Sequence, residues 1–403
     1  MRPDPDQTPA LPRRYEELNP GEQKQRLQDI ALVFLKLGTI AFGGPAAHIA
    51  MMNEEVVKRR KWLHADKLLD LLGITNLIPG PNSTELAIHI GYEMAGWRGL
   101  LIAGSCFILP AMLTVWALAA LYARYQTVPE VGWLLYGIKP VIIAIVAQAL
   151  WKLGKSAIKN PETAVASAAV IGFFWVGLDE ILLLLLAGLV VMLINNWFSS
   201  GGGTTTSLLL PIPGFLTLVS SPPTAAAKPV TWGNVFLFFL KIGSVLYGSG
   251  YVLLAFLQEK LVEQSQWLTS QQLLDAVAIG QFTPGPVFTT VTFIGYLLAG
   301  NAGAIAATIG IFLPAFVLVA VINPWVPLLR HSRWAAGFLD GVNAASLGLM
   351  AVVTWQLGFA ALVDWLTVIL AFLSFVAVFR FKVNSAWLVI AGGLVGFLSQ
   401  HLA

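Results

Sequence analysis

Two Pro-Gly-Pro tripeptides interrupt apolar stretches of the chain, at residues 79–81 and 284–286. A helix broken at such a point leaves backbone N–H groups unpaired at the start of the next helix, and in a bilayer these groups need a partner. An anion can be that partner, because the positive end of a helix dipole attracts it. The predicted anion-binding residues are the tripeptides and the side-chain donors that follow them: Pro79, Gly80, Pro81, Asn82, Ser83, Thr84, Pro284, Gly285, Pro286, Thr289 and Thr290.

The first break also has an explanation that needs no ligand. Asn82 and Glu85 have the spacing of a capping box, which would satisfy the free N–H groups locally. Glu85 itself is the strongest proton-coupling candidate, because a carboxyl group inside a membrane can carry a proton. The sequence leaves both interpretations open.

The first apolar segment of each half contains a second weak point. The residues there are small, and small residues permit either a kink or the close packing of two helices. A packing role therefore competes with ligand contact at each of these positions: Phe42, Gly43, Gly44, Pro45, Gly248 and Ser249.

Lys36 and Lys241 occupy equivalent positions inside the same two segments. A lysine in a membrane helix is costly unless it snorkels, pairs or faces a cavity. We predict that these two lysines attract an anion, with snorkelling as the alternative.

Other ionisable residues give weaker signals. Glu54 and Glu259 are equivalent and are further proton-coupling candidates, although a solvated helix end also explains them. The five histidines lack metal-ligand spacing and are interpreted as packing or interface residues. We predict no metal, no cofactor and no catalytic residue.

The composition indicates a membrane protein. The 403 residues are 57% hydrophobic and only 11% charged, against roughly 25% charged in soluble domains. Apolar runs of about 20 residues recur, which is the length that crosses a bilayer. The net charge of +3 is too small to indicate a nucleic-acid partner, and the single cysteine, Cys106, excludes an internal disulfide.

The chain is an internal duplication. FLKLG at 34–38 returns as FLKIG at 239–243, an offset of 205 residues that becomes 204 after one deletion. We predict a polar mobile tail at 1–29, a first repeat at 30–198, a linker at 199–231 and a second repeat at 232–402.

Each half predicts the same elements, and the fold class is an all-α polytopic membrane protein. We expect about five spanning helices per half, together with a re-entrant helical hairpin broken at Pro-Gly-Pro. In the first half the spans are near 30–52, 99–122, 131–153, 163–178 and 181–198, and the hairpin arms are 66–78 and 83–95.

Basic residues in equivalent loops predict opposite orientations for the two halves. Loops 53–67 and 152–162 carry eight Lys or Arg residues against one in their twins, whereas 123–130 and 179–180 carry one against four. If basic loops are cytoplasmic, the repeat is inverted, as in many secondary transporters. Five spans per half would then place the basic N-terminal tail outside. Either the tail crosses the membrane, or the Gly-Gly-Pro at 43–45 turns the first segment into a second hairpin.

The motifs resemble those of the chromate ion transporter family in its long, two-domain form. The runs AFGGPAAHIAMMNEEVVKRRKWL and NLIPGPNSTELAIHIGY are similar to its N-terminal half, and YGSGYVLLAFLQ and QFTPGPVFTTVTFIGYLLAG to its C-terminal half. The resemblance implies a multi-pass carrier of the bacterial inner membrane that exports chromate, a sulfate-like oxyanion, and gives chromate resistance. It places substrate contacts on residues 42–45 and 79–85 and their counterparts.

Several hypotheses stay open. Export could be driven by the proton gradient or by anion exchange, and an uptake permease for sulfate or another small anion is the main rival. An intramembrane enzyme is disfavoured, because the sequence shows no HExxH and no Ser-His pair at helical spacing. The expected partners are the oxyanion and the lipid bilayer, and a homodimer is a further hypothesis.

Overall fold

The computed structural model describes residues 15–42, 44–76, 78–125, 128–199, 230–247, 252–323 and 333–401, and every regular element in this part of the chain is a helix. Most of the predicted linker lies outside the described residues. The first half contains α1 (Pro20–Ile40), α2 (Pro45–Met52), α3 (Ala65–Thr75), α4 (Asn82–Tyr125), α5 (Pro129–Ala157), α6 (Pro161–Trp175) and α7 (Glu180–Ser199). The second half contains α8 (Trp232–Val245), α9 (Leu253–Leu257), α10 (Ser270–Phe282), α11 (Thr290–Ile322), α13 (Arg333–Ala361), α14 (Trp365–Arg380) and α15 (Ser385–His401).

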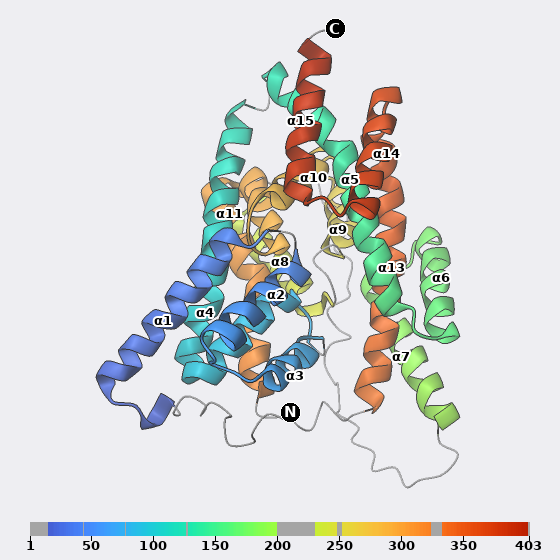
Figure 1. Cartoon of the computed structure of the whole chain (residues 1–403). Helices are drawn as coiled ribbons and strands as arrows, with labels where there is room; N and C mark the ends of the chain where they lie inside the picture. Colours follow the sequence, from blue (N-terminus) through green and yellow to red (C-terminus); the bar gives the residue numbers. More distant parts are fainter. Residues whose placement is uncertain are drawn as a thin grey trace.

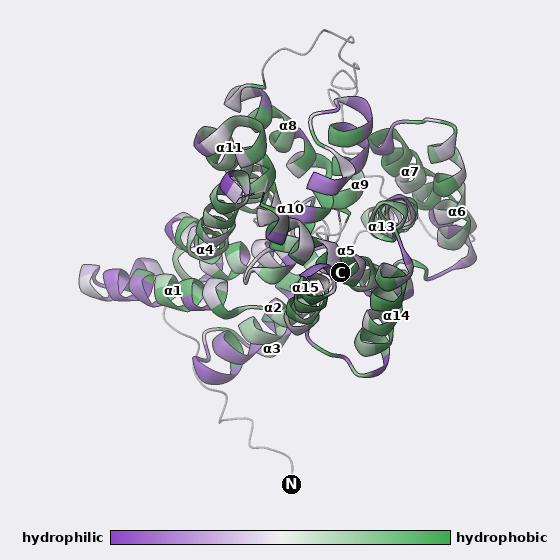
Figure 2. Ribbon diagram, turned by 90° about the horizontal axis from the view of Figure 1, so that it is seen from above, coloured by the Kyte–Doolittle hydropathy of each residue, from purple (hydrophilic) through white to green (hydrophobic). Residues whose placement is uncertain are grey.

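Within these residues, four helices are long and apolar enough to cross a membrane: α4, α5, α11 and α13. The prediction of a helical, polytopic membrane protein is confirmed, and Figure 2 shows hydrophobic ribbon over most of its helices. The count differs from the five spans predicted per half. Two causes are visible: the first segment of each half is broken, and α6, α14 and α15 have only 15, 16 and 17 residues, short of the roughly 20 that a span needs.

Helix α1 begins ten residues earlier than predicted. Asn19 and Glu22 form a reciprocal capping box, with the Glu22 N–H donating to Asn19 Oδ1 at 2.9 Å, and Pro20 fits the first helical position. The last ten residues of the predicted tail, 20–29, are therefore helical, while residues 1–14 lie outside the described part of the chain.

The predicted first span, 30–52, is a hairpin and not a single helix. α1 ends at Ile40, and α2 starts after Gly44, whose φ of +79° no helix accommodates. The returning arm runs back along α1, because Glu55 pairs with Lys36 at 3.3 Å and Arg60 lies 3.9 Å from Asp29. Of the two alternatives for the N-terminal tail, the contacts support the hairpin.

The hairpin predicted around the first Pro-Gly-Pro is also present. Lys67, near the start of α3, pairs at 2.9 Å with Glu93 of α4, so the start of the first arm lies beside the end of the second arm. α4 then bends at Ala95–Gly96 and folds back so closely that a Cβ on Gly91 or Gly99 would overlap the other's carbonyl oxygen. The second half repeats this geometry at Ala299–Gly300 and at Gly295 and Gly303.

Two pairs of repeat-related helices, α4 with α11 and α5 with α13, pack against each other in opposite directions, and the two halves share one core. The helices of each pair lie side by side in Figure 1. In α4 and α11, His89 lies beside Asn323 and Trp116 donates to Asn301. In α5 and α13, Gly154 lies against Leu347, and Lys159, just beyond α5, pairs with Asp340. Antiparallel twins are the arrangement that an inverted repeat requires. The side of a membrane that each end faces stays a prediction.

Cysteine labelling tests that prediction at two exposed, repeat-related positions. In a Cys106→Ser background, Lys58→Cys and Glu263→Cys are expected to react with an impermeant maleimide from opposite sides of the membrane, Lys58→Cys from the cytoplasm. Labelling of both from the same side would mean parallel insertion.

Candidate functional site

Each Pro-Gly-Pro tip contacts the end of the first helix of the other half. The Gly80 N–H donates to the Leu246 carbonyl at 2.7 Å, and the Gly285 N–H donates to the Ala41 carbonyl at 2.9 Å. Ala41 and Leu246 are repeat-related and stand where α1 and α8 end. The two glycine amides predicted to face an anion are therefore used to join the halves.

Polar side chains at the start of α4 form a second layer at this junction. Asn82 donates to Asn76 Oδ1 at 2.7 Å, and Ser83 lies 3.2 Å from Nδ1 of the buried His48, whose Nε2 lies 3.1 Å from the Ala41 carbonyl. Thr84 Oγ1 is buried and has no partner among the described residues. The contact between His48 and Ser83 holds α2 against α4, and Asn82 is partly exposed.

Glu85 does not form the capping box with Asn82. Its side chain is completely buried, and neither carboxylate oxygen has a hydrogen-bond partner in the described chain. It lies directly behind Gly80, since a Cβ on Gly80 would overlap Oε1, and it interacts electrostatically with Tyr247. An unpaired carboxylate is costly in such surroundings, so this position demands a functional explanation.

A cavity of about 1030 Å³ opens beside the junction, between α2, α5, α13 and the turn from α14 to α15. Four predicted site residues line it: Phe42, Gly44, Pro45 and Asn82. Its wall also includes Ser346, whose buried Oγ has no partner among the described residues.

Four exposed lysines border the same cavity: Lys152, Lys155, Lys159 and Lys382. Lys159 pairs with Asp340 at 2.7 Å. The sequence showed these lysines only as orientation signals, because residues 152–159 and 382 are far apart along the chain. Their grouping follows from the packing of α14 on α5.

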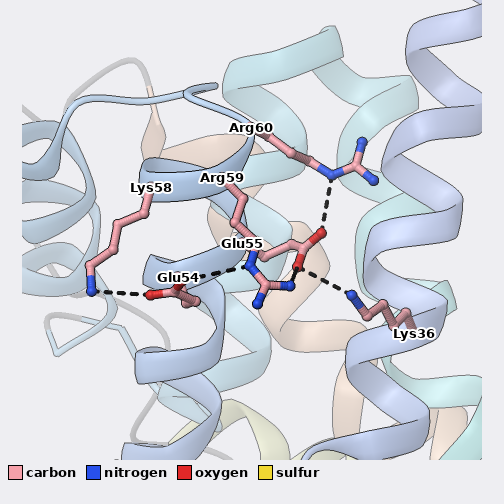
Figure 3. A network of polar contacts seen from close by, with 6 residues as sticks. All are labelled: Lys36, Glu54, Glu55, Lys58, Arg59 and Arg60. Atoms are coloured by element: carbon pink, nitrogen blue, oxygen red, sulfur yellow. Dashed lines mark hydrogen bonds and ion pairs between the residues drawn. The ribbon is translucent and has the colours of Figure 1, made fainter.

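Several predicted residues lie elsewhere. Lys36 belongs to the ion-pair network of Glu54, Glu55, Lys58, Arg59 and Arg60 on the first hairpin (Figure 3), and Lys241 is exposed. A hydrogen bond from Lys58 and the charge of Arg59 hold the pKa of Glu54 below its usual value, which keeps this carboxylate ionised. Glu259 accepts from Gln264 at 2.9 Å.

The second-half hydroxyls are satisfied locally. Thr289 donates to the Pro286 carbonyl at 2.7 Å and Thr290 to the Val287 carbonyl at 2.8 Å. Pro284 lies in the short segment that connects α10 to the helical turn at Val287–Thr289. Gly43, Gly248 and Ser249 lie outside the described residues.

Comparison with known proteins gives a consistent result. A family model described as chromate transporter matches residues 28–192 and 233–397, which are the two halves of the duplication. The chain is 30% identical to a chromate transport protein of Cupriavidus metallidurans over 383 residues, covering 93% of this chain and 94% of that protein.

Two further relatives match over similar lengths. A probable chromate transport protein of Synechococcus elongatus is 28% identical, covering 92% of this chain and 95% of the relative. A chromate transport protein of Pseudomonas aeruginosa is 29% identical, covering 91% and 90%. No solved structure matches the chain.

Proposed function

Because the chain belongs to the chromate transporter family, we propose that it carries chromate, a sulfate-like oxyanion, across the bacterial inner membrane. The observation that carries the proposal is the cavity of about 1030 Å³, which connects four exposed lysines to the junction of the hairpin tips. A dianion that leaves water needs compensating charge and hydrogen-bond donors. The cavity offers both.

The cavity suggests two stages of binding. Lys152, Lys155 and Lys382, which have no ion-pair partner among the described residues, raise the local concentration of anions through their summed field. Deeper in, Asn82 and the unpartnered hydroxyl of Ser346 can donate hydrogen bonds, and the amino-terminal end of α2 at Pro45 directs its dipole into the same space. Substrate contact at Phe42, Gly44, Pro45 and Asn82 is therefore part of the proposal.

We further propose that transport is export and that it is coupled to protons through Glu85. This carboxyl group is buried directly behind Gly80, at the point where the halves touch. A group so placed can exchange a proton as the tips move apart. Exchange against another anion remains the alternative for the coupling step.

Flux of radiolabelled chromate in proteoliposomes tests the proposal. We expect uptake that saturates with chromate concentration and responds to an imposed pH gradient, with sulfate as a weaker competitor. Transport of sulfate in preference to chromate would favour the rival permease. Flux of neither anion would remove the proposed function.

Charge removal at the cavity gives a more specific prediction. Lys152→Gln and Lys382→Gln are each expected to raise the apparent KM for chromate by about fivefold, which corresponds to a loss of about 1 kcal/mol per charge. Lys36→Gln is the matched control, because Lys36 is engaged with Glu55. The charge-compensating role predicted for Lys36 and Lys241 makes the opposite prediction, so the concentration dependence of these variants decides between the two.

A further inference from the structure

Two buried ionisable side chains lie one helical turn apart on α4. Glu85 and His89 are both fully buried, and residues four apart in a helix share one face, with about 5–6 Å between their Cβ atoms. Both carboxylate oxygens of Glu85 and Nε2 of His89 lack hydrogen-bond partners in the described part of the chain. Three unpartnered polar atoms in one turn are unusual in a protein interior.

The contact made by the other ring nitrogen of His89 determines which nitrogen can accept a proton. Nδ1 lies 3.2 Å from Oδ1 of Asn323, the residue that follows α11. An amide oxygen only accepts hydrogen bonds, so Nδ1 carries the hydrogen and Nε2 is left as a free proton acceptor. Asn323 thus orients the imidazole.

The pair belongs to the first half only. The corresponding turn of the second half, residues 287–295, contains no titratable side chain. A role in holding the fold together would be expected in both halves, because the hairpins, bends and glycine contacts all recur. The asymmetry points to a task performed once in each transport cycle.

We propose that His89 is a second proton-carrying residue, which passes protons between Glu85 and the end of the α4–α11 interface. This inference rests on the proposed function. No hydrogen bond joins the two side chains in this structure, so the transfer takes place when they approach each other as the tips move apart. A proton then leaves the Glu85 carboxyl group and binds Nε2 of His89, which gives a carboxylate and an imidazolium. The imidazolium afterwards releases a proton to water at the end of the interface marked by Asn323, and the neutral ring is restored.

The neighbouring charges suit such a transfer. Lys67 on α3 lies close enough to interact electrostatically with His89, and it pairs with Glu93 on α4. Its positive charge disfavours a long-lived imidazolium and so promotes release of the proton. On α11, the neighbour Asn323 is uncharged, and Tyr247 is the titratable group near Glu85 from the second half.

The test separates proton coupling from chromate binding in liposomes that contain the purified chain. Chromate/chromate exchange at equal pH measures binding and conformational change, whereas pH-driven chromate flux, with pyranine to follow protons, measures coupling. His89→Asn keeps a donor for Asn323 without a titratable group. We expect its exchange to stay within about twofold of the parent chain while its response to the pH gradient is lost.

His64→Asn is the control, because it removes a histidine outside this interface, and it should keep both activities. If His89→Asn does not fold, His89→Gln replaces it. The inference is overturned if the folded variant keeps its pH response or loses exchange as well. A parent chain that exchanges chromate without any pH response would also overturn it, with the proposed transport intact. Absence of exchange in the parent chain would instead remove the proposed function, and the inference with it.

Discussion

Gly80→Ala is expected to reduce chromate transport at least about 100-fold while the chain still inserts in the membrane. Gly80 has a φ of +140°, which a residue with a Cβ adopts only with strain. The new methyl group would also overlap Glu85 Oε1. To relieve both, the loop must move and weaken the 2.7 Å bond from Gly80 to the Leu246 carbonyl. A shift of about 1 Å in a binding site costs about 100-fold in rate.

Gly73→Ala is the matched control in the same hairpin. Gly73 lies in α3 with no atom near the position of a Cβ, and alanine favours a helix over glycine by about 1 kcal/mol. We expect normal transport per inserted molecule. If Gly80→Ala also transports normally, the junction of the tips is not the route of the substrate.

The parts of the fold that follow local rules could be predicted from the sequence. Two prolines within three residues, Pro79 and Pro81, remove two backbone donors and disfavour a continued helix, so their position predicts the tip of the second hairpin. The duplication supports this prediction, because the same break recurs at Pro284. The loop-charge pattern predicts an inverted repeat, for which antiparallel packing of α4 with α11 and of α5 with α13 is required, and the side of the membrane that each loop faces stays a prediction.

The parts that depend on contacts between distant residues could not be predicted. Nothing in the sequence near Gly80 indicates that its N–H bonds to Leu246 of the other half. Glu85 has the spacing of a cap but lies against Gly80 instead, because the tip folds over it. His89 looked like a packing residue, since its partner Asn323 is more than 200 positions away.

The two halves differ in charge at the cavity that the four exposed lysines border, and the duplication does not predict this difference. At the offset of 204, Lys152, Lys155, Lys159 and Lys382 correspond to Gln356, Phe359, Val363 and Leu178. The equivalent region of the other half is therefore without these charges. There, Lys139, the twin of the cavity-lining Asn343, pairs with Asp275 at 3.0 Å, and Tyr122 donates to the same carboxylate at 2.8 Å. One region carries exposed cations, and its twin carries a buried ion pair.

The burial of this pair predicts a large effect on stability. In Lys139→Met the Asp275 carboxylate, only 6% exposed, loses its counter-ion, and breaking a buried pair costs about 3–5 kcal/mol. Lys139→Met with Asp275→Leu should recover part of this loss, because replacing both partners leaves no buried charge but leaves the Tyr122 hydroxyl without its acceptor. Lys159→Met is the comparison, since it breaks the pair with Asp340 at a lysine that is 56% exposed, and exposed pairs contribute at most about 1 kcal/mol. The midpoints of thermal unfolding in detergent should therefore rank Lys139→Met lowest, the double variant above it, and Lys159→Met close to the parent chain. Equal shifts for the two single variants would mean that water reaches Asp275 as freely as Asp340.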